Sequence, residues 1–260
     1  MKYISPNRGN QIIPEYVKQQ RIIPDEPYLR VAEFFTNTLQ GEGIHTGKPC
    51  TFLRLQGCTL DCAWCDTKDI WEVGNPYTFN ELFFLMEKAG VIENLRQGHH
   101  LVFTGGSPLL QQDSLIAFIQ AFDLVYGFLP YVELENECTL MPLPAMEFLV
   151  NCWNNSPKLS HSGNGVRTRS YNIPVLRELS SYQNSWFKFV ITDEKDWDEI
   201  ETHYFLPKVI RKGQIILMPA GASLAELDRN RKWVAELAIK KGVRFSDRLH
   251  ITLWDKTTGV

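Results

Sequence analysis

Short apolar runs alternate along this chain with longer segments whose apolar residues recur at helical spacing. Each run is bounded by polar, proline or glycine residues, which is typical of strands. The runs that predict strands are 29–38, 51–56, 101–103, 131–134, 148–152, 187–191, 215–218 and 249–254.

Three of the intervening segments carry helix signals. Two of them open with a capping box, and each of the three ends at a glycine. The predicted helices, from capping residue to closing glycine, are Thr78–Gly90, Asp113–Gly127 and Ser223–Gly242. Short strands that alternate with helices imply a parallel sheet with right-handed crossovers. With about seven strands in one domain, the pattern predicts an α/β fold of the partial (β/α) barrel type.

The chain divides into two parts by composition. Residues 1–28 are polar and punctuated by prolines, so we expect an N-terminal extension wrapped over the rest. Residues 29–260 carry the alternating pattern without an internal repeat, and we expect them to form a single domain. Within this domain, 154–170 is polar and predicts a long loop or lid.

Composition narrows the possible functions. The chain has 260 residues, of which 44% are hydrophobic and 22% charged, enough for one large core. Its net charge of −3 argues against a nucleic-acid or anionic-membrane partner. No apolar run reaches membrane-spanning length, and the first residues lack an export-signal pattern, so we expect a cytoplasmic protein.

The strongest chemical signal is a group of three cysteines. Cys58, Cys62 and Cys65 follow the apolar run 51–56 at the spacing C-x3-C-x2-C. Three thiolates on one tight loop can hold three irons of a [4Fe–4S] cluster. The fourth iron then has no ligand from this loop and is free to bind a substrate or cofactor, which predicts an enzyme.

Two other interpretations remain open. Structural zinc usually takes four ligands from two short pairs of Cys or His, and no second pair follows this loop. The cysteines could also be ordinary buried thiols, because the remaining three are scattered singly: Cys50, Cys138 and Cys152. A disulfide framework is not expected in a chain of this length and apolar content.

Polar or glycine-containing segments follow the predicted strands. In (β/α) barrels the chemistry gathers at the carboxyl ends of the strands, so these segments should lie on one face. They are the cysteine loop after 51–56, 104–106 after 101–103, Glu135 after 131–134, 156–158 after 148–152 and 218–221 after 215–217.

The cysteine spacing resembles that of the radical S-adenosylmethionine (SAM) enzymes, and further motifs resemble the 7-carboxy-7-deazaguanine synthase family. The likeness spans residues 33–260 and is densest at 39–71. The matching segments are 40–43 (QGEG), 47–49 (GKP), 52–58 (FLRLQGC), 64–67 (WCDT), 104–106 (TGG), 156–158 (SPK), 249–254 (LHITLW) and 259–260 (GV).

The resemblance implies a reaction and its cofactors. Members convert 6-carboxy-5,6,7,8-tetrahydropterin to 7-carboxy-7-deazaguanine with ring contraction and loss of ammonia, on the route to queuosine and other deazapurines. It implies a radical SAM partial barrel, a [4Fe–4S] cluster, SAM and Mg²⁺. It also implies a homodimer and an electron donor such as a flavodoxin.

The resemblance assigns site residues as well. The cluster ligands are Cys58, Cys62 and Cys65, and Thr67 is the Mg²⁺ ligand. The residues implied for SAM are Trp64, Cys65, Asp66, Gly105, Gly106, Glu135, Ser156, Pro157, Lys158, Met218, Pro219, Ala220 and Gly221. The residues implied for the pterin are Leu39, Gln40, Gly41, Glu42, Arg54, Thr104, His250 and Val260.

The chain departs from the pattern at one important position. Ser107 stands where many radical SAM enzymes carry a glutamate that contacts the SAM ammonium, and Glu135 or Glu137 is a candidate substitute. Arg54 has a plain structural salt bridge as its alternative role. The alternative functions are a glycyl-radical-enzyme activase and a non-catalytic iron–sulfur or zinc protein.

Overall fold

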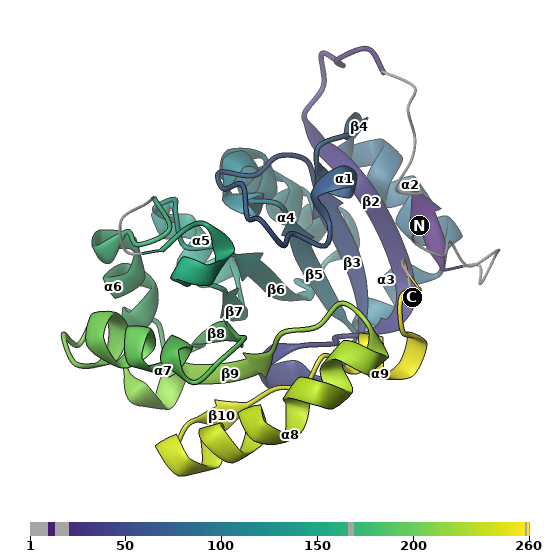
Figure 1. Ribbon diagram of the computed structural model, residues 1–260. Helices are drawn as coiled ribbons and strands as arrows, with labels where there is room; N and C mark the ends of the chain where they lie inside the picture. The colour runs from purple at the N-terminus through teal and green to yellow at the C-terminus, as the bar shows by residue number, and fades with distance from the viewer. Residues whose placement is uncertain (1–9, 14–20, 166–168, 258, 260) are drawn as a thin grey trace.

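The computed structural model describes residues 10–13, 21–165, 169–257 and 259. Its centre is a curved mixed sheet that contains ten strands among these residues (Figure 1). The strands are β1 (Gln11–Ile13), β2 (Tyr28–Leu39), β3 (Pro49–Leu55), β4 (Asn75–Thr78), β5 (His100–Gly105), β6 (Tyr131–Asn136), β7 (Cys152–Asn155), β8 (Ser185–Ile191), β9 (Ile215–Pro219) and β10 (Arg244–Phe245).

The sheet is parallel over most of its width. The strand order is β1-β2-β3-β5-β6-β7-β8-β9-β10, with β4 paired to β2, and every pair from β3 to β10 is parallel. Strand β2 runs antiparallel to β1, β3 and β4. The connection from β2 to β3 is too short for a helical crossover, which explains why this edge departs from the parallel pattern.

Helices lie between most of the parallel strands and cover one face of the sheet (Figure 1). Helices α2, α4, α6 and α8 contribute apolar side chains to the same core as the strands. The helices are α1 (Lys68–Trp71), α2 (Phe79–Lys88), α3 (Val91–Arg96), α4 (Gln112–Tyr126), α5 (Pro144–Leu149), α6 (Ile173–Ser181), α7 (Lys195–Ile200), α8 (Leu224–Lys241) and α9 (Leu249–Trp254).

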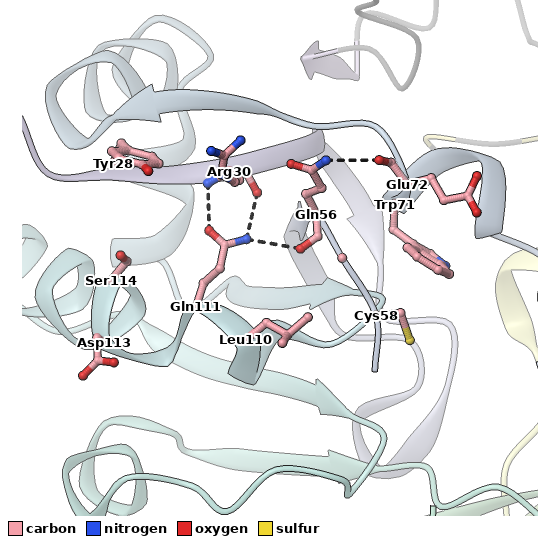
Figure 2. Close-up of a pocket in the computed structure, with 11 residues that line it drawn as sticks. Tyr28, Arg30, Gln56, Cys58, Trp71, Glu72, Leu110, Gln111, Asp113 and Ser114 are labelled. Atoms are coloured by element: carbon pink, nitrogen blue, oxygen red, sulfur yellow. Dashed lines mark hydrogen bonds between the residues drawn. The ribbon is translucent and has the colours of Figure 1, made fainter. Parts of the chain in front are cut away.

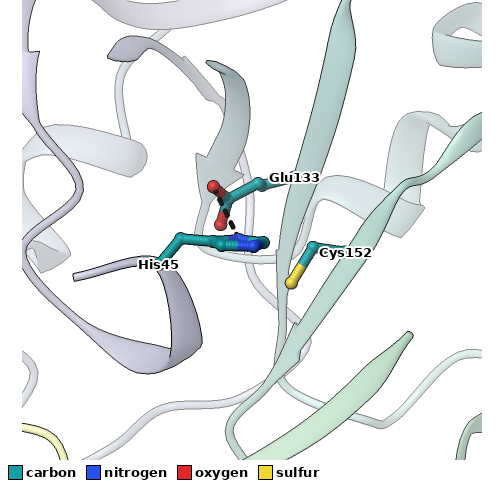
Figure 3. A group of neighbouring side chains, drawn as sticks. All are labelled: His45, Glu133 and Cys152. Atoms are coloured by element: carbon teal, nitrogen blue, oxygen red, sulfur yellow. Dashed lines mark ion pairs between the residues drawn. The ribbon is translucent and has the colours of Figure 1, made fainter. Parts of the chain in front are cut away.

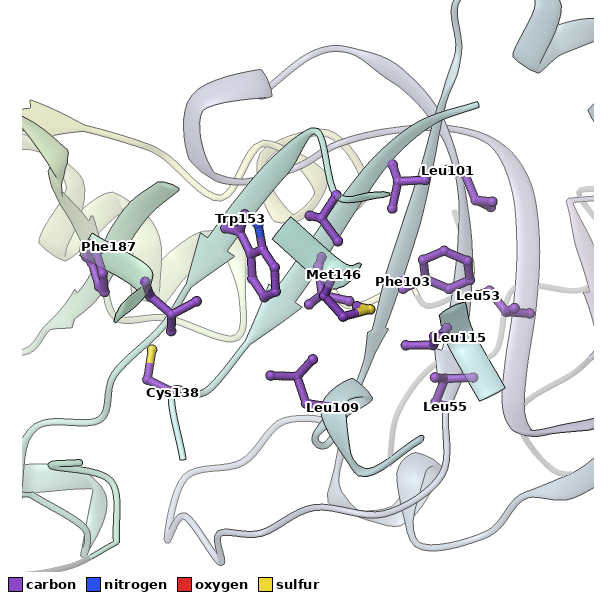
Figure 4. Close-up of a cluster of buried hydrophobic side chains, with 14 of the residues drawn as sticks. Leu53, Leu55, Leu101, Phe103, Leu109, Leu115, Cys138, Met146, Trp153 and Phe187 are labelled. Carbon is purple, nitrogen blue, oxygen red and sulfur yellow. The ribbon is translucent and has the colours of Figure 1, made fainter. Parts of the chain in front are cut away.

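Residue alternation in the strands separates a core face from a polar face. Leu101 and Phe103 of β5 point into the apolar core together with Trp153 of β7 (Figure 4). Glu133 of β6 and Lys188 of β8 are also buried, but they lie outside that apolar cluster. Because side chains alternate between the two faces of a strand, these charged residues belong to the inner, concave face. The polar site therefore lies inside the curve of the sheet.

Most of the predicted elements are confirmed, and the α/β partial barrel is the observed fold. The capping box of Thr78 and Glu81 is complete at the start of α2. The second box is half formed, because Ser223 caps α8 while the Glu226 carboxylate accepts from the N–H of Ala222. Asp113 lies in the first turn of α4 and does not cap it.

Two predicted strands were wrong. Residues 148 and 149 end the helix α5, which begins at Pro144, and the strand β7 starts only at Cys152. Residues 249–254 form the helix α9. The sheet position beside β9 is taken by β10, so the last apolar segment has no strand partner there. It folds instead as a helix with Ile251 as its buried residue.

Segments at the two ends of the chain lie on the long strand β2. Residues 11–13 form β1, which pairs with Phe34 and Phe35 of β2. Gly259 approaches β1 so closely that an added Cβ would lie 2.5 Å from the Gln11 side chain. Residues 1–9 and 14–20 of the expected extension fall outside the described residues. No described helix is both long and apolar enough to cross a membrane.

Candidate active site

The cysteine motif forms the loop that connects β3 to α1. Cys58, Cys62 and Cys65 are free thiols, all partly exposed. The loop is held at its start by the N–H of Gly57, which donates to the Trp71 carbonyl at 3.0 Å. The three cysteines predicted as cluster ligands therefore share one surface loop at the carboxyl end of a central strand.

Each loop sulfur accepts a hydrogen bond from an N–H group. The pairs are Leu60 N to Cys58 at 3.4 Å, Asn164 Nδ2 to Cys62 at 3.3 Å and Trp71 Nε1 to Cys65 at 3.4 Å. Such donors stabilise thiolate ligands and tune the potential of a cluster. Burial raises the pKa of Cys58, and that of Cys62 to about 11. A metal that binds these sulfurs would favour their deprotonated form.

The three loop sulfurs are not grouped as the ligands of one zinc ion would be. Sulfur ligands of one tetrahedral zinc lie about 3.8 Å apart, given Zn–S bonds of about 2.3 Å. Among the described residues, the only three metal-binding groups whose donor atoms all lie within 4.8 Å of one another are elsewhere, at His45, Glu133 and Cys152. The loop cysteines are therefore spread more widely than one ion requires.

The glycine pair after β5 allows two loops to pack tightly. A Cβ on Gly106 would lie 2.3 Å from the Gly57 carbonyl oxygen and 2.4 Å from Cys58 Cβ. A Cβ on Gly105 would lie 2.4 Å from the Leu55 carbonyl oxygen. The resemblance assigned these glycines to SAM binding. Close packing of the β5 loop against β3 and the cysteine loop also requires glycine at both positions.

Ser107 and Glu137 also contact the cysteine loop. The Ser107 hydroxyl accepts the N–H of Thr59 at 2.9 Å and lies 3.6 Å from Cys58 Sγ. Glu137 is 4% exposed, and its Oε1 accepts from the hydroxyls of Thr59 at 3.0 Å and Thr139 at 2.5 Å. Its Oε2 is buried and has no hydrogen-bond partner among the described residues. Glu137 therefore carries an unsatisfied acceptor beside the loop.

The segment after β7 covers the cysteine loop from the other side. Lys158 Nζ donates to Ser156 Oγ at 2.9 Å and lies 5.7 Å from the centre of the Trp64 ring. Trp64 Nε1 donates to His161 Nδ1 at 3.1 Å, and the two rings stack. The predicted loop 154–170 is thus partly strand β7 and partly a cover over the cysteines, while 166–168 falls outside the described residues.

A network of buried charges lies on the inner face of the barrel. Glu42 accepts a short hydrogen bond from Lys188 and one of 2.8 Å from Arg248 Nε. Burial opposes ionisation of Glu42, but Lys188 and Arg248 hold its pKa well below the usual value. The carboxylate is therefore ionised and fixed between two cations.

Glu135 belongs to the same network. Its carboxylate accepts from Gln40 Nε2 at 3.3 Å and lies 3.6 Å from Lys188 Nζ. Burial raises the pKa of Glu135, and the nearby carboxylates of Glu42 and Glu133 raise it further. The resemblance assigned Glu135 to SAM and Gln40 and Glu42 to the pterin. In the structure Glu135 contacts Gln40 directly and shares Lys188 with Glu42.

Arg248 joins three of the predicted segments. Besides Glu42, its guanidinium donates to Asp66 Oδ2 at 2.7 Å and to the Gly221 carbonyl at 2.6 Å. Burial favours the neutral form of Asp66, but the charge of Arg248 and its hydrogen bond lower the pKa of Asp66 below the usual value. Sequence reasoning missed both Arg248 and Lys188. Lys188 had a usable signal, because it interrupts the apolar strand 187–191, but nothing marked Arg248.

His250 lies against Gly41 in this region. An added Cβ on Gly41 would lie 2.1 Å from His250 Nδ1, and the N–H of Leu249 donates to the Gly41 carbonyl at 2.8 Å. Burial and the charge of Arg248 lower the pKa of His250 to about 4, so its ring is neutral at pH 7. Helix α9 therefore docks on the glycine-rich loop after β2.

Other predicted residues lie in or beside β2, β3, β5 and α1. Arg54 Nε pairs with Glu33 Oε2 at 3.0 Å, so the structural salt bridge is present. Thr104 is buried in β5 in register with Arg54, and Leu39 ends β2. Thr67 precedes α1, but its side chain does not cap the helix. Val260 lies outside the described residues.

A separate pocket of about 600 Å³ lies behind the cysteine loop (Figure 2). The Gln111 side chain accepts from the N–H of Arg30 at 2.8 Å and donates to the carbonyls of Arg30 and Gln56. Cys58 is the only predicted site residue that lines it. The pocket is therefore distinct from the charged network on the inner face.

Comparison with known proteins identifies the family. A curated relative from Pyrobaculum aerophilum, named 7-carboxy-7-deazaguanine synthase, is 32% identical over 90% of this chain and 98% of its own length. The chain belongs to the 7-carboxy-7-deazaguanine synthase family. A relative of the same name from Halobacterium salinarum is 30% identical over 89% of this chain and 92% of its own. The model of the family described as a 4Fe-4S single cluster domain matches residues 39–128.

The structural comparison agrees with the fold. The crystal structure of QueE from Escherichia coli superposes with a TM-score of 0.60, covers 86% of this chain and 95% of its own, and shares 24% sequence identity. Membership of the deazaguanine synthase family supports a [4Fe–4S] cluster and SAM as cofactors, and the three free thiols fit that cluster. The glycyl-radical-enzyme activase is not favoured.

We predict that Gly106→Ala disturbs the cluster loop. The added methyl group overlaps Gly57 and Cys58, and such overpacking costs about 1–3 kcal/mol. The variant should retain less iron per chain after anaerobic reconstitution. Gly213→Ala is the matched control, since a Cβ there meets nothing within 4 Å. Equal iron content in both variants would contradict this packing role.

We also predict that Arg248→Gln lowers the free energy of unfolding by about 2–4 kcal/mol, because it removes charged hydrogen bonds to Glu42 and Asp66. Urea denaturation measures the change. Arg248→Lys should recover part of it, since it restores the charge but not the forked geometry. A loss below about 0.5 kcal/mol, the usual range for surface substitutions, would show that the network contributes little.

Proposed function

We propose that the protein forms 7-carboxy-7-deazaguanine from 6-carboxy-5,6,7,8-tetrahydropterin on the route to queuosine and other deazapurines. The main support for this proposal is the position of Arg248. It contacts Asp66 on the cysteine loop and Glu42 on the charged, mostly buried inner face, and so brings the two parts of the site together. When bound, the cluster and SAM supply one-electron cleavage that yields a 5′-deoxyadenosyl radical.

The inner face supplies groups suited to a pterin. Glu42 is an ionised acceptor with both oxygens held, so it can receive N–H groups from the guanidine-like edge of the ring. Gln40 is fixed by two carboxylates and adds further polar contacts. Lys188 is 3% exposed and keeps the Glu42 carboxylate charged for this contact. These groups would orient the ring before hydrogen abstraction.

Glu135 is the best candidate for moving a proton during loss of ammonia. Its side chain is 24% exposed, so part of it faces open space beside Lys188 and Gln40. The raised pKa of Glu135 brings its protonated form closer to neutral pH, as general acid–base catalysis requires. We therefore place Glu135 on the substrate, not on SAM as the resemblance suggested.

The SAM side of the site is proposed from the residues around the cysteine loop. Trp64, Ser156 and Lys158 lie together next to Cys62, where Lys158 lowers the pKa of the thiol against the effect of burial. Positive charge at this position suits the SAM carboxylate. Thr67 has a hydroxyl not used in capping α1, and we propose it as one ligand of Mg²⁺, with substrate oxygens and waters as the others.

A flavodoxin-type electron donor, a homodimer and a cytoplasmic location complete the proposal. The family resemblance supports the first two, and the sequence pattern supports the third.

The deciding experiment is an anaerobic assay of the reconstituted protein with SAM, a reductant and the carboxytetrahydropterin. We expect 5′-deoxyadenosine and 7-carboxy-7-deazaguanine to form together, with less product when Mg²⁺ is omitted. Mass spectrometry detects both products. Deoxyadenosine without the deazaguanine would overturn the proposed substrate and revive the activase hypothesis.

We further propose that Glu137 replaces the glutamate missing at Ser107 and binds the SAM ammonium. Glu137 contacts Thr59 of the cysteine loop, and its buried Oε2 has no hydrogen-bond partner among the described residues. Loss of a charged hydrogen bond costs about 1.5–3 kcal/mol, so Glu137→Gln should raise the SAM dissociation constant roughly tenfold or more. Equilibrium dialysis on cluster-loaded protein measures this constant.

The control for Glu137 is Glu147→Gln, which changes an exposed carboxylate on α5. It should leave SAM affinity unchanged, and both variants should keep a full complement of iron. An unchanged dissociation constant in Glu137→Gln would assign the ammonium contact to another group.

A further inference from the structure

A second cluster of metal-binding side chains lies away from the cysteine loop. His45 closes the short turn after β2, Glu133 lies in β6, and Cys152 is the first residue of β7 (Figure 3). One donor atom from each lies within 4.8 Å of the other two. The cysteine loop follows the end of β3, whereas the strand register places Cys152 level with Phe52 in the middle of β3, so the two places are separate.

The cluster contains a buried negative charge. Glu133 is 0% exposed, and its Oε1 lies beside the Nδ1 atoms of both His100 and His45. Among the described residues, its ion pairs are with these two histidines alone. A cation placed here would add to these partners and further stabilise the buried carboxylate.

The geometry at His45 is that of a co-ligand. Its Nδ1 is buried and lies 3.2 Å from Glu133 Oε1, but the two atoms are not aligned as a hydrogen bond. Nitrogen and oxygen ligands of one tetrahedral ion, each about 2.1 Å from it, lie about 3.4 Å apart. The observed separation is therefore close to that of two atoms facing one ion.

Neighbouring side chains hold Glu133 in place. His100 Nδ1 donates to Glu133 Oε1, and Asn154 Nδ2 donates to Oε2 at 2.7 Å. The Tyr131 ring stacks on His100 with centroids 4.0 Å apart. Ligating carboxylates in metal sites are oriented by outer partners of this kind. The support for a metal ion is thus already built into the cluster.

We propose that His45, Glu133 and Cys152 bind a Zn²⁺ ion, with water at the fourth position. Imidazole, carboxylate and thiolate together suit zinc, whereas Mg²⁺ and Ca²⁺ prefer oxygen ligands alone. Gln40 donates to Glu133 and to Glu135, so the ion would brace the loop that carries Gln40 and Glu42. Binding of this ion does not depend on the proposed reaction.

The test uses cluster-loaded protein, in which the loop cysteines are already occupied by iron. After equilibration with Zn²⁺ and gel filtration, elemental analysis should find about one zinc per chain. X-ray absorption at the zinc edge should show a single sulfur at about 2.3 Å with nitrogen and oxygen ligands at about 2.0–2.2 Å. Three sulfurs would place the zinc on the cysteine loop and overturn the proposal.

Two variants and a matched control complete the test. His45→Ala changes a partly exposed side chain, so it should fold and keep its iron while zinc affinity falls roughly tenfold or more. Cys152→Ser should remove the sulfur signal. Cys138→Ser alters another buried cysteine outside the cluster and should retain zinc. Absence of bound zinc in the unsubstituted protein, or equal zinc in His45→Ala, would overturn the proposal and leave a histidine–carboxylate cluster without metal.

Discussion

The arrangement of the whole site depends on one carboxylate held between two cations. Glu42 lies on the loop after β2, Lys188 projects from β8, and Arg248 immediately precedes α9. A charge taken out of water is costly unless it is paired, so the displacement of any one of the three weakens the pairing of the others. Arg248 extends the constraint to Asp66 on the cysteine loop. The interaction thereby fixes the distance between the iron–sulfur loop and the inner face of the barrel.

The same strands build both the core and the site. Along β6, Val132 and Leu134 pack into the core, while Glu133 and Glu135 face inward. Along β8, Phe187 and Phe189 pack outward on either side of Lys188. Because successive side chains point to opposite faces of a strand, these polar side chains lie on the concave face. The apolar residues on the other face pack into the core and hold the strand backbone in place. Rigid strands position a site more accurately than loops do.

The sequence was sufficient to predict the fold class and the cysteine loop, because both are encoded by local patterns. The strand before the loop and the capped helix from Thr78 were recognisable from their own residues. The errors arose where neighbours decide the outcome. Residues 249–254 look like a strand, but the sheet offers them no free edge beside β9.

The contacts among the candidate site residues were not predictable from the sequence. Glu42 and Asp66 were recognised, yet the residue that links them was not, because no local signal distinguishes Arg248 from a surface arginine. The resemblance placed Glu135 with the SAM residues, whereas in the folded sheet it contacts Gln40 and Lys188, which its own sequence does not indicate. Contacts between distant segments are a property of the folded sheet, and a one-dimensional pattern does not contain them.

The pairing of Glu42 with Arg248 has a consequence for synthesis in the cell. The two residues are separated by 206 positions. At about 5–20 residues per second, a ribosome adds Arg248 roughly 10 to 40 seconds after Glu42. During that interval the nascent chain has its cysteine loop but not the arginine that secures it. Iron delivered too early would meet an unsecured loop, so cluster insertion is best timed after the ribosome has released the chain.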